Sequence, residues 1–113
     1  MTQTAALDSQ LSAIADPTRR AVVELLATGP QRASDLANRT GTSRSRMSKH
    51  LRVLLDAGIA RDERPPEDAR ARVFHLQPQA IDDMRGWMER LQGEWDARLQ
   101  SFKEHVEQRA HDD

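Results

Sequence analysis

Five cations and no acid lie within residues 36–55, the basic segment of a 113-residue chain whose formal net charge is -1. Their guanidinium and ammonium groups can donate charged hydrogen bonds to oxyanions such as phosphates. Leucines and a methionine alternate with the cations, so an apolar side is expected as well. The segment indicates an anionic partner, although most charge runs are only solvated faces. The five cations are Arg39, Arg44, Arg46, Lys49 and Arg52.

The rest of the chain offsets this charge and limits the available chemistry. Residues 82–113 carry five cations and nine anions. The absence of cysteine excludes disulfides, thiolate metal sites and cysteine nucleophiles. The first ten residues lack the basic start and apolar run of a signal peptide, and no apolar stretch approaches the roughly 18 residues that span a membrane. We therefore expect a cytoplasmic protein without a membrane partner.

Capping residues place the basic segment on the second of two short helices. Ser43 is a suitable N-cap for this helix. A shorter helix precedes it, beginning near Ser34 or Asp35 and ending at Gly41. Two short helices joined by a turn of three or four residues that contains glycine form a helix-turn-helix. The sequence therefore predicts this motif over residues 34–58.

The second helix of the motif has an apolar side and a polar side. Met47, Leu51 and Leu54 recur at helical spacing and are expected to face the core. Lys49 and Arg52 lie opposite them on a helical wheel. The leucines and the cations therefore occupy different sides of one helix.

Two helices are expected before the motif. Apolar residues at helical spacing predict a short amphipathic helix over residues 5–15. A second helix is marked by Asp16 as its cap and Pro17 at its first position, and Gly29 ends it.

After the motif the sequence predicts a β-hairpin. Residues 59–64 and 71–76 are short segments of roughly alternating character, and a pair of prolines between them suits a loop tip. Phe74 and Leu76 are expected to face the core.

Residues 80–109 then read as one long helix with an apolar seam. The seam residues recur every three or four positions, a spacing typical of contact between helices. A dimer interface is favoured over a ligand pocket on this helix. The apolar seam consists of Ile81, Met84, Met88, Leu91, Trp95, Leu99, Phe102 and Val106.

Three motifs in this order make the chain resemble ArsR/SmtB-type bacterial transcriptional regulators. They are ADPTRR at residues 15–20, S-x-x-x-M-S-K-H-L-x-V-L at residues 43–54 and L-x-x-A-G-I at residues 54–59. Together with the hairpin, the resemblance covers roughly residues 7–76, and the long last helix also suits it.

The resemblance implies a winged helix-turn-helix fold, mostly α with a small β-hairpin in the order α-α-α-α-β-β-α. The whole chain, residues 1–113, would form one domain, with a wing at 59–76 and a dimerisation helix at 80–109. It also implies a homodimeric repressor in which the first and last helices of each chain pair. The expected dimer residues are Leu7, Leu11, Ile14, Met84, Met88, Leu91, Trp95, Leu99 and Phe102.

A helix of this kind reads DNA bases in the major groove with side chains near its N-terminus. Arginine can bond both O6 and N7 of guanine, and serine can bond several base edges or a phosphate. Wing arginines could reach a neighbouring minor groove or backbone, although nearby acids weaken that interpretation. The expected contacts to double-stranded operator DNA are Arg44, Ser45, Arg46, Ser48, Lys49, His50 and Arg52 on the helix and Arg64, Arg70 and Arg72 in the wing.

His50 has two interpretations that the sequence leaves open. Its imidazole could donate to a phosphate, or it could pack against the preceding helix.

The sequence also allows a function other than DNA binding. A winged-helix module could use the same basic helix to bind an acidic protein partner. An enzyme is not expected, because no nucleophile–base pair, phosphate loop or carboxylate pair stands in a recognisable context.

The chain departs from the metal-sensing members of the family that it resembles. The region before the turn has no cysteine, and Gln108 stands three residues after His105 where those members offer a histidine or glutamate. We therefore expect no metal and no cofactor. The effector would be a small organic molecule, or there would be none.

Overall fold

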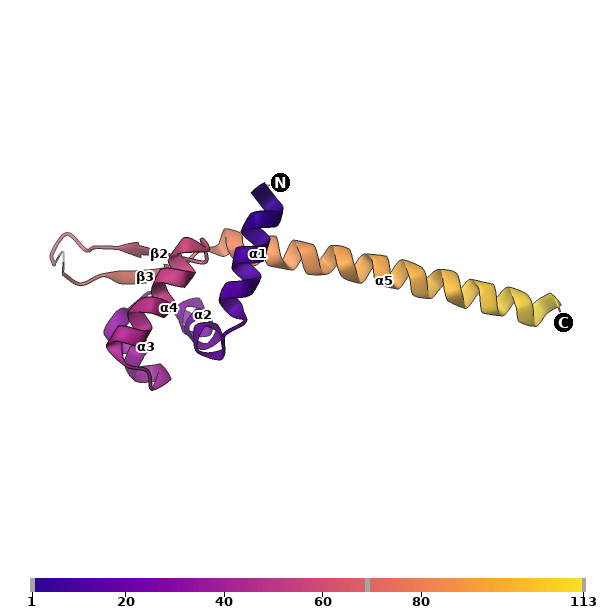
Figure 1. Cartoon of the computed structure of the whole chain (residues 1–113). Helices are drawn as coiled ribbons and strands as arrows, with labels where there is room; N and C mark the ends of the chain where they lie inside the picture. The colour runs from indigo at the N-terminus through magenta and orange to yellow at the C-terminus, as the bar shows by residue number, and fades with distance from the viewer. Residues whose placement is uncertain (1, 69, 113) are drawn as a thin grey trace.

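The structure, a computed structural model, describes residues 2–68 and 70–112. Five helices and three short strands follow one another in this part of the chain, and the order confirms the predicted winged helix-turn-helix (Figure 1). The elements are α1 (Thr2–Ile14), α2 (Pro17–Thr28), β1 (Gln31–Arg32), α3 (Ala33–Thr40), α4 (Arg44–Asp56), β2 (Ala60–Glu63), β3 (Val73–Leu76) and α5 (Pro78–Asp112).

Side-chain caps fix the starts of the two helices for which the sequence predicts them. The Asp16 carboxylate accepts a hydrogen bond from the Arg19 backbone N–H at 3.0 Å, and the Ser43 hydroxyl accepts one from the Arg46 N–H at 3.2 Å. Gly41 ends α3 with a φ of 66°, a left-handed conformation that glycine adopts without strain. α3 begins at Ala33, so Ser34 and Asp35 lie near its start as predicted.

One apolar core holds α2, α3 and α4 together beneath the sheet. Leu36, Met47 and Leu54 are fully buried, and Leu51 is nearly so, which confirms the predicted inner face of the second helix of the motif. Phe74 closes the core from β3. Because these side chains come from three different elements, their burial fixes the orientation of α4 relative to the rest of the fold.

The sheet has a third strand that the sequence does not indicate. β1 pairs antiparallel with β3, placing Gln31 opposite Phe74, and the strand order is β1-β3-β2. β2 and β3 are shorter than predicted because backbone N–H groups of the wing loop are hydrogen-bonded within the loop. The N–H groups of Ala71 and Arg72 donate to the carbonyls of Asp68 and Arg70 within the loop and do not enter the ladder.

α5 leaves this core as a long rod (Figure 1). At about 1.5 Å per residue its 35 residues span roughly 52 Å. The radius of gyration is 20.5 Å, whereas a compact chain of this length has a value of about 13 Å. Most of α5 therefore projects away from the core.

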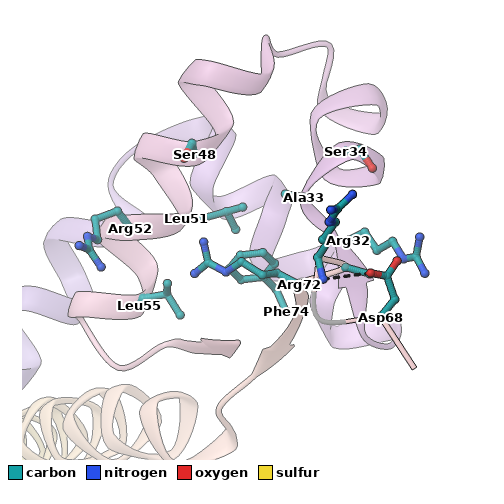
Figure 2. A pocket seen from close by; sticks show the side chains of 12 residues that line it. Arg32, Ala33, Ser34, Ser48, Leu51, Arg52, Leu55, Asp68, Arg72 and Phe74 are labelled. Carbon is teal, nitrogen blue, oxygen red and sulfur yellow. Dashed lines mark hydrogen bonds between the residues drawn. The ribbon is translucent and has the colours of Figure 1, made fainter. Parts of the chain in front are cut away.

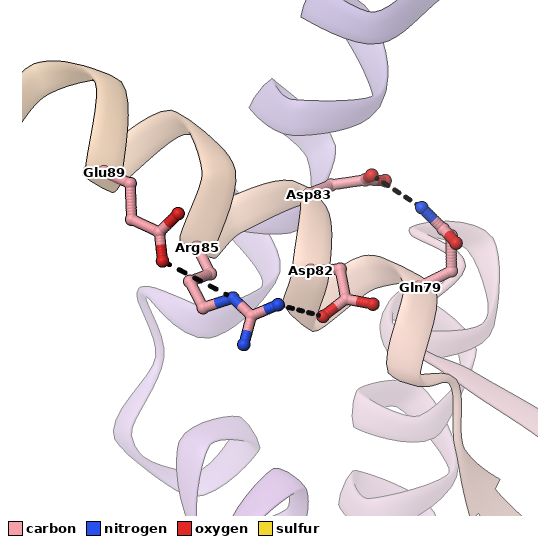
Figure 3. A network of polar contacts seen from close by, with 5 residues as sticks. All are labelled: Gln79, Asp82, Asp83, Arg85 and Glu89. Atoms are coloured by element: carbon pink, nitrogen blue, oxygen red, sulfur yellow. Dashed lines mark hydrogen bonds and ion pairs between the residues drawn. The ribbon is translucent and has the colours of Figure 1, made fainter.

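The root of α5 is fixed to α1 by a polar cluster. The buried amide of Gln10 donates to Asp83 at 3.3 Å, and Gln79 donates to the other oxygen of the same carboxylate at 3.0 Å. Next to it, Arg85 is bonded to Asp82 and paired with Glu89 (Figure 3). The direction in which α5 projects is thus set at its first two turns.

Replacing Leu54 tests how strongly the core holds α4. Leu54→Ala removes a fully buried side chain and should lower the free energy of unfolding by about 2–5 kcal/mol. The neighbouring Val53 is 37% exposed, so Val53→Ala should cost about 1 kcal/mol or less. Urea unfolding followed by circular dichroism at one protein concentration measures both. Equal losses would show that α4 is not anchored by this face.

Candidate nucleic-acid interface

The outward face of α4 presents the polar residues of the basic segment to solvent. All six predicted helix contacts other than His50 are exposed. Within the described residues none of their cationic groups takes part in an ion pair, so their charge is unneutralised. This face combines hydroxyls and free cations, the groups that contact phosphates and base edges. The six residues are Arg44, Ser45, Arg46, Ser48, Lys49 and Arg52.

His50 differs from its neighbours because it is half-buried against α2. Its Nδ1 atom lies 3.3 Å from Nη1 of Arg19. A guanidinium can only donate hydrogen bonds, so a hydrogen bond at this contact requires Nδ1 to be the acceptor. The contact is with α2 and not with α3, the helix that precedes α4, and nothing in the sequence connects His50 with Arg19.

Arg19 joins three elements at this point. Its Nε donates to the carbonyl of Ala13 at 2.6 Å and its Nη2 to that of Ser12 at 3.4 Å, both at the C-terminal end of α1. A cation is favourable at that end of a helix dipole. Its backbone N–H bonds to Asp16 and holds the pKa of that carboxyl below its ordinary value. Arg19 therefore links the end of α1 and the start of α2 to α4.

The three predicted wing arginines differ in whether their guanidinium groups are ion-paired. Arg72 donates from Nε and Nη2 to one oxygen of Asp62, at 2.9 and 2.7 Å, and lies 5.1 Å above the Phe74 ring. This hydrogen bonding lowers the pKa of Asp62. Arg64 and Arg70 are exposed, and the described residues offer them no ion pair. Arg72 thus stabilises the wing, and the other two arginines extend into solvent.

A groove separates α4 from the wing (Figure 2). It has a volume of about 590 Å³, and we refer to it as the arginine groove. Its polar lining comes from β1, the start of α3, α4 and the wing, and consists of Arg32, Ser34, Ser48, Arg52, Asp68, Arg70 and Arg72. Sequence reasoning missed Arg32 and Ser34, because only the pairing of β1 with β3 brings them beside the wing.

The predicted dimer residues fall into two groups. Met84 is mostly buried within the chain, and Leu7, Leu11 and Ile14 are half-buried. Beyond them the exposed part of the apolar seam runs along one side of the projecting rod, with Phe102 the most accessible at 67%. The exposed seam residues are Met88, Leu91, Trp95, Leu99, Phe102 and Val106.

Neither a metal centre nor a membrane span is found among the described residues. Within 2–68 and 70–112 no three histidine or acidic side chains gather closely enough to hold a metal ion. None of the helices in that part of the chain combines the length and apolarity needed to cross a bilayer.

Comparison with known sequences now identifies the family. The profile described as "Bacterial regulatory protein, arsR family" matches residues 16–62, which include the helix-turn-helix. The HTH-type transcriptional regulator Rv2034 of Mycobacterium tuberculosis is 34% identical over 105 residues, which cover 93% of this chain and 92% of that protein. The chain belongs to the ArsR family. The transcriptional repressor SdpR of Bacillus subtilis is 30% identical over 82 residues, which cover 73% of this chain and 88% of SdpR.

Solved ArsR-type structures share the fold along most of the chain. An ArsR-like transcriptional regulator from Rhodococcus sp. RHA1 superposes with a TM-score of 0.78 at 29% identity, covering 92% of this chain and 95% of that one. The ArsR family transcriptional regulator RHA00566 superposes with a TM-score of 0.74 at 29% identity, covering 82% and 93%. This ArsR protein is therefore a DNA-binding transcriptional regulator and not an enzyme, as the sequence predicts.

Replacing Arg19 tests the junction that it forms. Arg19→Ala should lower the free energy of unfolding by about 1.5–3 kcal/mol, the range for hydrogen bonds that involve a charged group. Arg20→Ala is the matched control, because Arg20 also donates to carbonyls at the end of α1, those of Ile14 and Ala15, but is exposed, and its loss should be smaller. Urea unfolding measures both variants.

A double-mutant cycle with His50→Ala isolates the contact between Arg19 and α4. We expect a coupling energy of at least about 0.5 kcal/mol, the lower end for residues in contact. Additive effects of Arg19→Ala and His50→Ala would show that Arg19 supports α1 and α2 alone.

Proposed function

We propose that this ArsR protein is a homodimeric repressor of its own operon, which binds a pseudo-palindromic operator by inserting α4 of each chain into the major groove. The chain acts as a single domain in this proposal. The observation that supports it is the outward face of α4, which is cationic and exposed while its inner face is buried. Arg44, Ser45, Ser48 and Lys49 lie in its first two turns, where a recognition helix meets base edges. Arg46 and Arg52 flank them and would bind phosphates.

The exposed apolar seam supports dimerisation. From Ile81 to Val106 it makes seven steps over 25 residues, a mean of about 3.6 per turn that equals the period of a straight α-helix. The seam therefore stays on one side of the rod and can cover a second copy along its length. Two recognition helices placed about 34 Å apart would then read half-sites one helical turn apart.

The charge distribution fits this arrangement. Residues 82–112 carry five cations and eight anions, and they lie on the rod that leaves the core away from the wing (Figure 1). Acidic residues beside DNA would repel its phosphates. A docked α4 therefore places the basic segment against DNA and leaves the acidic residues outside the contact.

Reversing charge on α4 tests the docking. Arg44→Glu combined with Lys49→Glu should abolish binding of DNA from the region upstream of the protein's own gene, because two phosphate or base contacts become repulsive. Fluorescence anisotropy with that fragment measures the affinity, and its decline with salt should be steep.

The matched control is Arg90→Glu combined with Lys103→Glu, which makes the same charge change on α5. It should bind the fragment almost as well as the unmodified protein. If the α4 variant also binds normally, the docking is wrong. If the unmodified protein is folded but enriches no sequence from genomic DNA at low salt, a module that binds an acidic protein partner becomes the better interpretation.

Glutamates on the apolar seam test dimerisation. Leu91→Glu combined with Leu99→Glu puts two charges into the proposed interface and should produce monomers in light scattering. Arg90→Glu combined with Ala97→Glu puts two glutamates on the opposite side of the same helix and should leave the dimer intact. Dimers in both variants, or monomers in both, would contradict an interface made by the seam.

A further inference from the structure

We propose that the arginine groove binds a small organic anion, an apolar ring or chain that carries a phosphate or carboxylate group, and that this ligand and DNA exclude each other. The site itself is independent of the proposed function, whereas the exclusion of DNA rests on the proposed docking of α4. The groove volume of about 590 Å³ lies within the range of roughly 300–1,000 Å³ found for small-molecule sites.

The charges lining the groove favour an anion. Four arginines meet one carboxylate there, and Arg72 is already neutralised by Asp62 outside the groove. Among the described residues no ion pair involves Arg32, Arg52 or Arg70. These three come from β1, α4 and the wing, so the fold and not one charged run brings all three to the rim of the groove.

Uncharged donors add to this preference. Ser34 and Ser48 face the groove from α3 and α4 (Figure 2), and a smaller hollow beside it adds Arg44. The N-terminal turn of α3 has no side-chain cap, because its N-cap residue Arg32 makes no such bond. Free N–H groups at a helix N-terminus favour an anion. Asp35 in the same turn offsets part of this charge, but it does not line the groove.

The floor of the groove indicates that its ligand is more than a phosphate. Leu51 and Leu55 of α4 and Ala71 and Phe74 of the wing also line the groove, and all of them except Leu55 are buried. A DNA backbone would supply phosphates for the rim and nothing for this apolar floor. An organic anion would use both, because its charged group would meet the arginines while its apolar body is removed from water.

Calorimetry with three probes tests the site on the full-length protein without DNA. 1-Naphthyl phosphate carries the charge and the apolar body, inorganic phosphate carries only the charge, and 1-naphthalenemethanol carries only the body. We expect 1-naphthyl phosphate to bind at least about tenfold more tightly than either of the others.

Two pairs of variants locate the binding. Arg32→Gln combined with Arg70→Gln should weaken 1-naphthyl phosphate by at least about tenfold, since two charged hydrogen-bond donors are lost. Both residues are exposed, and circular dichroism checks that the fold is kept. Arg85→Gln combined with Arg90→Gln removes the same charge from α5 and should leave the affinity unchanged.

Competition with labelled DNA at constant ionic strength tests the exclusion. At ten times its own dissociation constant, 1-naphthyl phosphate should raise the apparent Kd for DNA about elevenfold. An unchanged Kd for DNA with 1-naphthyl phosphate bound would overturn the exclusion.

The remaining outcomes separate this inference from the proposed function. If 1-naphthyl phosphate binds no more tightly than inorganic phosphate, or equally well to the Arg32 and Arg70 variant, the inference is overturned, whether or not DNA binds. If the site binds 1-naphthyl phosphate as expected but the protein binds no DNA, the proposed function fails and the site stands.

Discussion

The burial of one face of α4 is the constraint on which the rest of the structure depends. Met47, Leu51 and Leu54 pack against side chains of α2, α3 and β3, and rotating the helix would expose all three at a cost of about 1.5–3 kcal/mol each. The cations between them are therefore held outward without any contact of their own. An exposed, unpaired set of arginines contributes little to stability, so their position reflects the needs of binding and is maintained by the core.

Arg19 extends this constraint to the other end of the molecule. It bonds to carbonyls of α1 and contacts His50 of α4, while Gln10 ties the same α1 to the root of α5 through Asp83. A continuous series of polar contacts thus runs from the recognition helix to the helix that carries the apolar seam. In the proposed dimer, a change in how the seams pack has a physical route to the angle of α4.

Local signals made most of the fold predictable. Asp16 and Ser43 cap helices where the sequence expects them, and the periodicity of Met47, Leu51 and Leu54 gave the inner face of α4. Non-local pairing made the rest inaccessible. β1 has only two residues, and its partner lies about 40 residues away in β3, so no periodicity can indicate it. The arginine groove was missed for the same reason, because Arg32 joins it only through that pairing.

The wing shows how one arginine can lose the role that its position suggests. From sequence, Arg70 and Arg72 are equivalent cations near a loop tip. In the structure Asp62, opposite Phe74 in the ladder, takes both Nε and Nη2 of Arg72 and holds its guanidinium over the ring. The pair of Asp62 and Arg72 stiffens the base of the wing loop. Arg70, two residues before Arg72 in the loop, forms no ion pair with the described residues. Asp62 thus fixes the backbone from which the free arginine extends.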